Sequence, residues 1–186
     1  MRKRVLALST FFLFLLSSQL FGVEIVGPEV RVGFHEIMVD AGLSLDERIL
    51  SELKSGMEKE ITFYIDLFKV WRGWPDEFML GKKFVQTLKG DSIKGEYIAT
   101  SFDGETYIKK RFRSFASMVS WTLNKKDIRL VNHIKELEPA DYFVKVTVES
   151  RLRKLPPVIG YLLFFVPEKD FVVSKNSPAF TIEGEK

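Results

Sequence analysis

Apolar and polar side chains alternate most clearly along residues 142–152, which read YFVKVTVESRL. Successive side chains of a β-strand point to opposite faces, so this pattern, which begins with Tyr142, predicts a strand with one buried face. Residues 61–71 (ITFYIDLFKVW) alternate in the same way. There Tyr64 and Phe68 make the second face half apolar, which favours a central strand.

Turn signals divide much of the remaining chain into short alternating runs. The apolar phase slips near Gly33, where we expect a turn or a bulge. Further along, a Gly-Asp pair at residues 90–91 and an Asp-Gly pair at residues 103–104 each separate two alternating runs. These pairs predict two hairpins, and therefore a meander of three strands over residues 78–112.

Two short helices interrupt the predicted strands. Ser44 and Glu47 have the spacing of a capping box, apolar residues recur every four positions behind them, and Gly56 stands where a helix would end. This pattern predicts a helix over residues 46–56. A second apolar stripe at helical spacing predicts another helix over residues 114–124.

Eight or nine short strands with two short helices predict a mainly β fold. We expect a single β-rich domain over residues 23–186, built as a two-sheet sandwich that carries the helices at an end or an edge. A half-barrel wrapped on a helix is the alternative. The segment has no internal repeat and no long linker, and its length suits one domain with a full hydrophobic core.

Residues 1–22 have the order of a signal peptide. Three cationic residues at positions 2–4 precede an apolar run over residues 5–16, which is shorter than the ~20 residues that a membrane-spanning helix needs. We therefore predict export to the periplasm or cell envelope, with cleavage after Gly22. An uncleaved N-terminal segment that anchors the protein is the alternative.

Removing this segment changes the charge of the protein. The whole chain has 28 Lys and Arg against 25 Asp and Glu, and the segment holds three of the cations and no acid, so 28 less three leaves 25 of each. This balance gives the exported part no net attraction for nucleic acid. The sequence has no cysteine, which excludes disulfides, catalytic thiols and thiolate metal sites.

Two aromatic residues flank an arginine directly after the predicted central strand. Trp71, Arg72 and Trp74 could stack on a ligand, with Arg72 holding an anion. We favour a structural role instead, in which the indoles close the end of the core and the arginine pairs with Asp76 or Glu77.

Candidate catalytic chemistry is weak in this sequence. Gly-Asp-Ser at residues 90–92 would make Ser92 a hydrolase nucleophile with His133 as its base, and His35 with His133 would hold a metal ion. Neither histidine has the spacing that these sites use. We favour a hairpin turn and surface histidines, and we expect no metal and no cofactor.

A cluster of cations follows the second predicted hairpin turn, at Lys109, Lys110, Arg111 and Arg113 around Phe112. Such a cluster is typical of a solvated strand or of a sheet edge protected against pairing. Contact with lipid headgroups or with an acidic partner is the functional alternative.

Residues 158–166 (VIGYLLFFV) are strongly apolar and lie between Pro157 and Pro167. The stretch is too short to span a membrane as a helix, and Gly160 and the prolines oppose a helix. It is either a buried core strand or an exposed patch for a partner protein or a membrane surface. In the second case the contact residues are Tyr161, Leu162, Leu163, Phe164 and Phe165.

Several of these segments together resemble one known family. They are WRGW at residues 71–74, KGEY at residues 94–97, Phe112 before the second helix, and residues 142–152 followed by Leu155-Pro156. In this order the chain resembles the bacterial domain-of-unknown-function family DUF 4390 over essentially all of residues 23–186. It departs from the family near the end, where Phe171 and Phe180 stand at places that tend to hold tryptophan. The resemblance implies a small envelope protein of unsettled function and supplies no catalytic residue.

We therefore expect an exported, non-catalytic module of the cell envelope that binds a partner protein or a membrane surface. One alternative is the hydrolase or metal enzyme described above. Another is a carrier for an apolar small molecule, which would need an enclosed cavity lined by Phe and Leu. The sequence indicates no particular partner and no oligomeric state.

Overall fold

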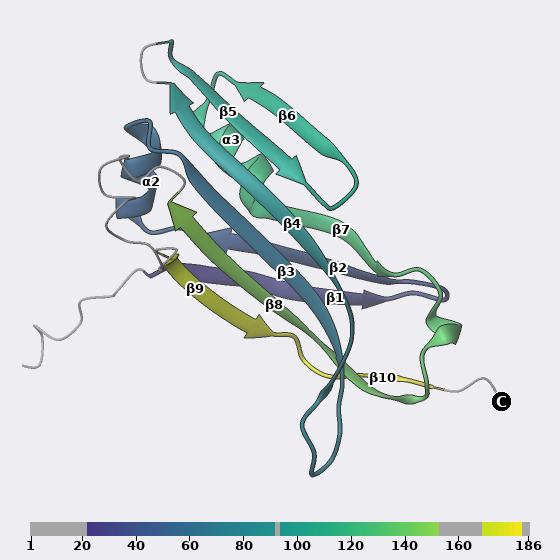
Figure 1. Ribbon diagram of the computed structural model, residues 1–186. Coiled ribbons are helices and arrows are strands. Elements are labelled where there is room, and N and C mark those ends of the chain that lie inside the picture. The colour runs from purple at the N-terminus through teal and green to yellow at the C-terminus, as the bar shows by residue number, and fades with distance from the viewer. Residues whose placement is uncertain (1–21, 92–93, 153–168, 184–186) are drawn as a thin grey trace, which may run out of the picture.

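The computed structural model describes residues 22–91, 94–152 and 169–183, and its strands form two antiparallel sheets (Figure 1). In chain order the elements are β1 (Glu24–Val32), β2 (Ile37–Ser44), α2 (Glu47–Lys54), β3 (Lys59–Lys69), β4 (Glu77–Asp91), β5 (Glu96–Phe102), β6 (Tyr107–Phe112), α3 (Phe115–Leu123), β7 (Asn124–Val131), the 3-10 turn η1 (Ile134–Glu136), β8 (Ala140–Leu152), β9 (Lys169–Asn176) and β10 (Phe180–Ile182).

The larger sheet has seven strands and contains both segments with the clearest alternation. Its order is β10-β8-β3-β4-β5-β6, and β9 pairs with β8 beside β10. β3 pairs with β8 without a register shift from Lys59 to Lys69 and with β4 on its other side. This arrangement confirms a central strand for residues 61–69 of the predicted run, and the strand ends before residues 70 and 71. The smaller sheet has three strands, in the order β1-β2-β7.

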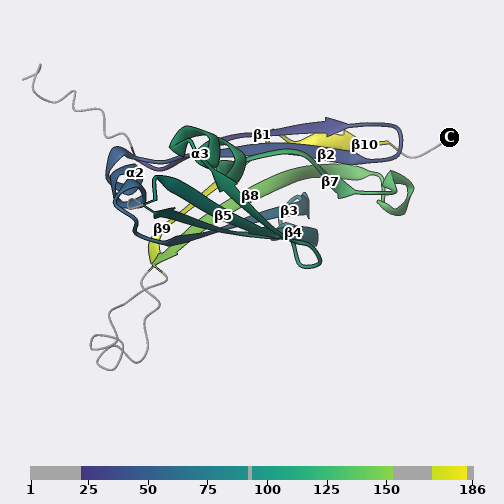
Figure 2. The same cartoon turned by 90° about the horizontal axis from the view of Figure 1, so that it is seen from above.

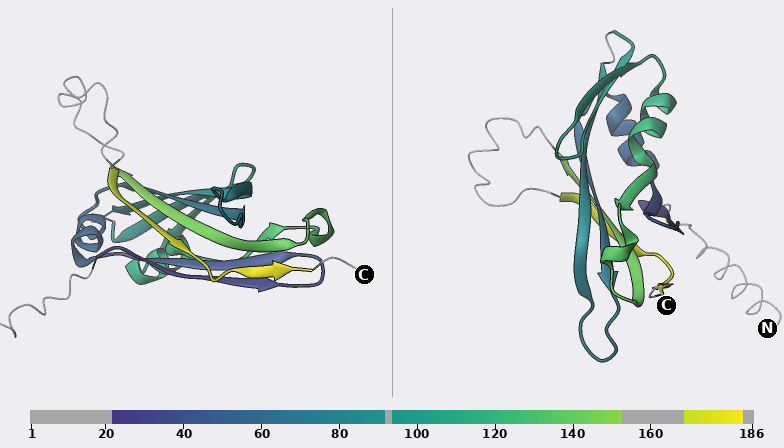
Figure 3. Two further views of the ribbon diagram at one scale, coloured as in Figure 1. Left: turned by 90° about the horizontal axis from the view of Figure 1, so that it is seen from below. Right: turned by 90° about the vertical axis from the view of Figure 1, so that its right-hand side faces the viewer.

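The smaller sheet and both helices cover the same face of the larger sheet (Figures 2 and 3). We call this covered side the inner face and the opposite side the outer face. Alternate side chains of β3 from Ile61 to Leu67, and of β8 from Tyr142 to Val148, are fully buried in the core beneath the inner face. The covering layer contributes to the same core Ile37 and Val39 from β2, Ile49 and Leu53 from α2, and Met118 and Leu123 from α3.

These two layers confirm a mainly β fold with a two-sheet sandwich, and the half-barrel alternative is wrong. The helices do more than flank the sandwich, since three strands cannot cover seven and the helices complete the covering layer. No helix among the described residues is long and apolar enough to cross a membrane.

Both predicted helices are present and are slightly shorter than expected. α2 begins after Asp46, whose carboxylate accepts a hydrogen bond from the Ile49 amide at 2.8 Å, so the N-cap is Asp46 and not Ser44. Gly56 follows the helix with φ of +96°, a conformation in which glycine is favoured. α3 begins after its N-cap Ser114 and leads directly into β7.

Two of the three predicted turns lie where the sequence indicated them, and the first hairpin turn lies later in the chain. The Gly33 amide bonds to the Glu36 carbonyl in the turn between β1 and β2. Strands β4, β5 and β6 form the predicted meander, and the Asp103 carboxylate accepts from the Thr106 amide at 2.7 Å in the second turn. At the first predicted turn β4 instead continues to Asp91, which pairs with Glu96 of β5, so residues 90–91 belong to a strand.

Candidate interaction surface

The outer face of the seven-stranded sheet is not covered by any helix or strand of the described chain (Figures 2 and 3). Side chains that alternate with the buried ones point to it, including Tyr64 and Phe68 of β3. A sheet with one packed face and one solvated face is common among antiparallel sheets, and its solvated face is normally polar. This outer face instead carries two groups of aromatic and aliphatic side chains.

The first group is the aromatic cluster, formed by Phe68, Phe78 and Phe143 on three neighbouring strands. Phe68 stacks on Phe143 with ring centroids 5.4 Å apart and meets Phe78 edge to face at 5.8 Å. The register brings them together, since Phe68 pairs with Phe78 across β4 and with Phe143 across β8. Phe78 is 57% exposed, so the cluster buries apolar surface on itself and still presents part of it to solvent.

The second group lines an open groove of about 620 Å³ across β4, β5 and β6. The groove combines apolar side chains with hydroxyl groups and lysines. Tyr107, at 64% exposure, and Phe102, at 40%, are its aromatic walls. Its volume is in the range of small-molecule sites, but its lining is half polar and it is open along the sheet. The lining residues are Glu58, Val85, Thr87, Lys89, Ile98, Thr100, Phe102, Tyr107 and Lys109.

A polar network lies beside these two groups on the outer face. The largely buried Glu149 carboxylate accepts from Tyr64 at 3.2 Å and pairs with Arg151 and Lys169 at 2.9 and 2.8 Å. The hydrogen bond from Lys169, together with these charges, outweighs burial and lowers the pKa of Glu149. Burial and the neighbouring carboxylate raise the pKa of the Tyr64 hydroxyl. The network links side chains of β3, β8 and β9.

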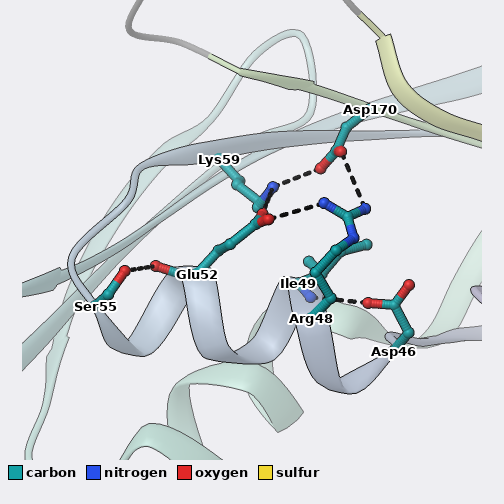
Figure 4. A network of polar contacts seen from close by, with 7 residues as sticks. All are labelled: Asp46, Arg48, Ile49, Glu52, Ser55, Lys59 and Asp170. Carbon is teal, nitrogen blue, oxygen red and sulfur yellow. Dashed lines mark hydrogen bonds and ion pairs between the residues drawn. The ribbon is translucent and has the colours of Figure 1, made fainter.

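Figure 4 shows a second polar network, which joins α2 to β3 and β9. The Lys59 side chain is completely buried, and its Nζ lies 2.5 Å from Asp170 Oδ2 and 2.6 Å from Glu52 Oε2. Arg48 pairs with the same two carboxylates from the solvent side. Because every charge in this group has an opposite partner, we interpret it as a structural brace.

The residues Trp71, Arg72 and Trp74 lie in the connection between β3 and β4, and the expectation that they close the core is wrong. Trp74 is 78% exposed and Trp71 is 46% exposed. The Trp71 indole donates to Glu77 at 3.0 Å and receives the Lys69 ammonium over its ring. In the described residues Arg72 forms no ion pair with either acid named for it. The connection extends beyond the paired ends of β3 and β4 and therefore does not pack on the core. Where the pairing ends could not be read from the sequence.

The candidate catalytic residues do not converge in the part of the chain that the structure describes. Ser92 lies outside the described residues, and its neighbour Asp91 ends β4 at the α2 end of the sheet. His133 instead precedes η1 beside the turn after β1, where the Ile134 amide donates to the His35 carbonyl. The backbones of the two histidines are therefore close, but no group of three metal-ligating side chains occurs among the described residues.

Two further expectations concern parts of the chain that the structure does not describe. The apolar stretch with Tyr161, Leu162, Leu163, Phe164 and Phe165 lies outside the described residues, and so does the predicted signal segment up to residue 21. Both expectations stay predictions.

Sequence reasoning missed the aromatic cluster and the aromatic walls of the groove. One signal was available, since the half-apolar second face of residues 61–71 already contains Tyr64 and Phe68. Phe78 and Phe143 could not be joined to them, because their contact depends on the register of three strands. The buried Lys59 was missed as well, because an isolated lysine at a strand end is usually exposed.

Comparison with known proteins identifies the family but no relative of known function. A family model described as a domain of unknown function, DUF4390, matches residues 24–177. No curated protein and no solved structure matches the chain. The match runs from the first residue of β1 to just past β9, and thus includes every strand of the larger sheet except β10. The resemblance noted in the sequence is therefore confirmed, and the chain belongs to the DUF4390 family.

Proposed function

We propose that this chain is an exported, non-catalytic module of the bacterial cell envelope that binds a partner protein through the outer face of its seven-stranded sheet. Export is inferred from the order of residues 1–22 alone. A membrane surface is the other occupant that the sequence suggested, and it is treated as an outcome of the test below.

One observation carries the proposal, namely the exposed apolar surface on the uncovered face. The aromatic cluster and the groove place Phe78, Phe102 and Tyr107 on adjacent strands of one sheet, each with at least 40% of its surface in solvent. Burying apolar surface is the main favourable contribution in most protein association, and aromatic residues are enriched at interface centres. Solitary exposed hydrophobic residues need no explanation, whereas residues gathered on one face indicate a contact surface.

Neither alternative gains a specific observation. The hydrolase needs Ser92 near His133, and the adjoining Asp91 lies at the other end of the sheet. The carrier needs an enclosed apolar cavity, and the groove is open and half polar.

Site-specific photo-crosslinking in the native host tests the proposal. A photoreactive amino acid at position 78 or 102 should give one discrete protein adduct, because a partner seated on the outer face covers both positions. Matched control positions are 26 and 126, which are exposed on the smaller sheet. We expect no adduct there.

The outcomes separate the two occupants of the outer face. Adducts at positions 78 and 102 that mass spectrometry identifies as lipid would replace the protein partner by a membrane surface. No adduct at either position, or the same adduct at all four, would reject the outer face as a docking surface.

A further inference from the structure

Strand β6 ends the seven-stranded sheet and, among the described residues, pairs only with β5 (Figure 1). Along an edge strand every second residue directs its backbone N–H and C=O groups away from the sheet, where they can pair with another chain. The remaining edge strands differ from β6: β10 is short, and β9 lies against β1. From the inner side α3 supports β6, with Trp121 packed against Phe112.

The edge carries a concentration of positive charge that the described residues do not neutralise. Lys109, Lys110, Arg111 and Arg113 are all exposed, and none of them forms an ion pair in the part of the chain that the structure describes. Most other arginines in the described ranges have carboxylate partners, as Arg31 has with Asp40 at 2.9 Å. Lys110 instead lies over the Trp121 ring, with its Nζ 4.8 Å from the centroid.

We propose that the free edge of β6 binds an extended, acidic segment of a partner protein by strand addition. The inference rests on the proposed binding function and states the chemistry of one part of the partner. Backbone hydrogen bonds to β6 would supply affinity, and alternate side chains of the added strand would supply specificity. Carboxylates opposite Lys109 and Arg111 would complement the uncompensated charge.

Charge and position decide against two simpler explanations. A second copy of this chain pairing edge to edge would place cationic strands against each other, which is unfavourable. The second explanation is that the lysines only protect the edge against pairing, in which case we would expect polar residues beside them. Instead Tyr107 and Ile108 of the same strand are 64% and 42% exposed, and both are apolar enough to contact an added strand. Tyr107 and Lys109 further belong to the groove, so an added strand would lie along its open side.

A synthetic peptide in which glutamate alternates with valine is the probe, added to the purified protein. Hydrogen exchange of the β6 amides, followed by NMR, is the measurement. We expect slower exchange at every second amide of β6 and weaker binding as salt is raised. A matched peptide with lysine in place of glutamate should not bind, and N-methylation of alternate peptide amides should abolish binding, because it removes the donors.

Variants of the protein test the role of charge without touching the core. The double variant Lys109→Glu with Arg111→Glu should bind the glutamate peptide about tenfold more weakly than the unaltered protein does. The control, Arg72→Glu with Lys126→Glu, makes the same change in net charge at exposed positions in the β3–β4 connection and on β7, away from β6, and should bind the peptide as the unaltered protein does.

Several results would overturn the inference. One is that the glutamate peptide leaves hydrogen exchange of the β6 amides unchanged, and another is that the lysine peptide binds as tightly as the glutamate peptide. A third is that phosphatidylglycerol vesicles, and not the peptide, slow the exchange of the β6 amides. Failure of strand addition leaves the cross-links at positions 78 and 102 intact. Failure of the proposed function removes those cross-links whatever the peptide does, so the two failures are distinguishable.

Discussion

Lys59 Nζ and Asp170 Oδ2 lie 2.5 Å apart, although 111 residues separate them in the sequence. The lysine is completely buried and the Asp170 side chain is only 9% exposed. Together with Glu52 they connect α2, β3 and β9 at one end of the sandwich (Figure 4). A buried cation is tolerated there because two carboxylates surround it.

Removing one acid of this brace should destabilise the protein. Asp170→Asn deprives buried Lys59 of one of its two carboxylates, and we expect a loss of about 3 kcal/mol in the free energy of unfolding. Replacing both partners by apolar residues, in Lys59→Met with Asp170→Leu, should recover much of that loss because no buried cation remains. Urea denaturation of the three proteins measures both effects. Equal stability of the single variant and the unaltered protein would contradict the brace.

The same brace should make the stability of the protein depend on pH in the acidic range. The Lys59 hydrogen bond lowers the pKa of Glu52 below its ordinary 4.5. Burial raises the pKa of Asp170, but Lys59 and Arg48 outweigh it and hold that pKa below its ordinary 3.8. Because both carboxyl groups have lower pKa values in the folded protein than in the unfolded chain, their ionised forms stabilise the fold fully above the ordinary pKa values. This stabilisation is lost as pH falls through the folded-state pKa values. Unfolding midpoints between pH 7 and pH 3 should fall less steeply in Glu52→Gln than in the unaltered protein.

Lys125 should make stability rise with pH in the alkaline range as well, through burial of a cation instead of pairing of carboxylates. It lies in the core over the Phe63 and Phe84 rings, and Gln86, with its amide turned to satisfy both ends, accepts from Nζ at 2.8 Å. Burial lowers the pKa of Lys125 from 10.5 to about 8. Between these values the unfolded chain holds a proton that the folded chain has released, so stability rises with pH.

The rise amounts to about 3 kcal/mol at most, at 1.36 kcal/mol for each unit of pKa. Urea denaturation from pH 7 to pH 10 should therefore show increasing stability relative to Lys125→Met, which lacks the titrating group. Parallel curves for the two proteins would show that Lys125 keeps its proton in the fold.

Two phenylalanines on opposite faces of the sheet should differ sharply in their contribution to stability. Phe63→Ala removes a fully buried ring of the inner face, and we expect a loss of about 4 kcal/mol. Phe78→Ala truncates a ring that is more than half exposed, and we expect less than about 1 kcal/mol. Thermal melting of both variants measures the contrast. A loss at position 78 as large as at position 63 would mean that the aromatic cluster serves folding and not binding.

Export has a direct test in the native host. Mass spectrometry of the protein recovered from the cell envelope should show a chain that begins at Val23, because the cationic segment and apolar run before it have the order of a cleaved signal. Recovery of the chain with residues 1–22 intact from the soluble cytoplasmic fraction would reject the prediction. Recovery of the same intact chain from membranes would instead identify the anchored form.

Much of the fold could be predicted because its signals are local. Alternation along residues 142–152 predicted β8, and glycine at position 56 predicted the end of α2. The N-cap of α2 was predicted two residues too early, because Ser44 and Asp46 are both suitable N-cap residues. The structure shows that the Asp46 carboxylate accepts the hydrogen bond from the Ile49 amide. The exposure of Trp71 and Trp74 was wrongly predicted, because aromatic composition does not say whether a connection between strands packs on the core.

Local sequence patterns were enough to predict both helices, several of the strands and the class of fold, because periodicity, caps and turn residues act over a few positions, and the order of short motifs indicated the family. Tertiary structure alone decided which strands are neighbours, and therefore that Phe68, Phe78 and Phe143 meet on the outer face. It also decided that Lys59 meets Asp170 and that β6 is an edge. These relations depend on strand order and register, and the pairing energy of two strands is set by the packing of both partners, which no single segment of sequence contains.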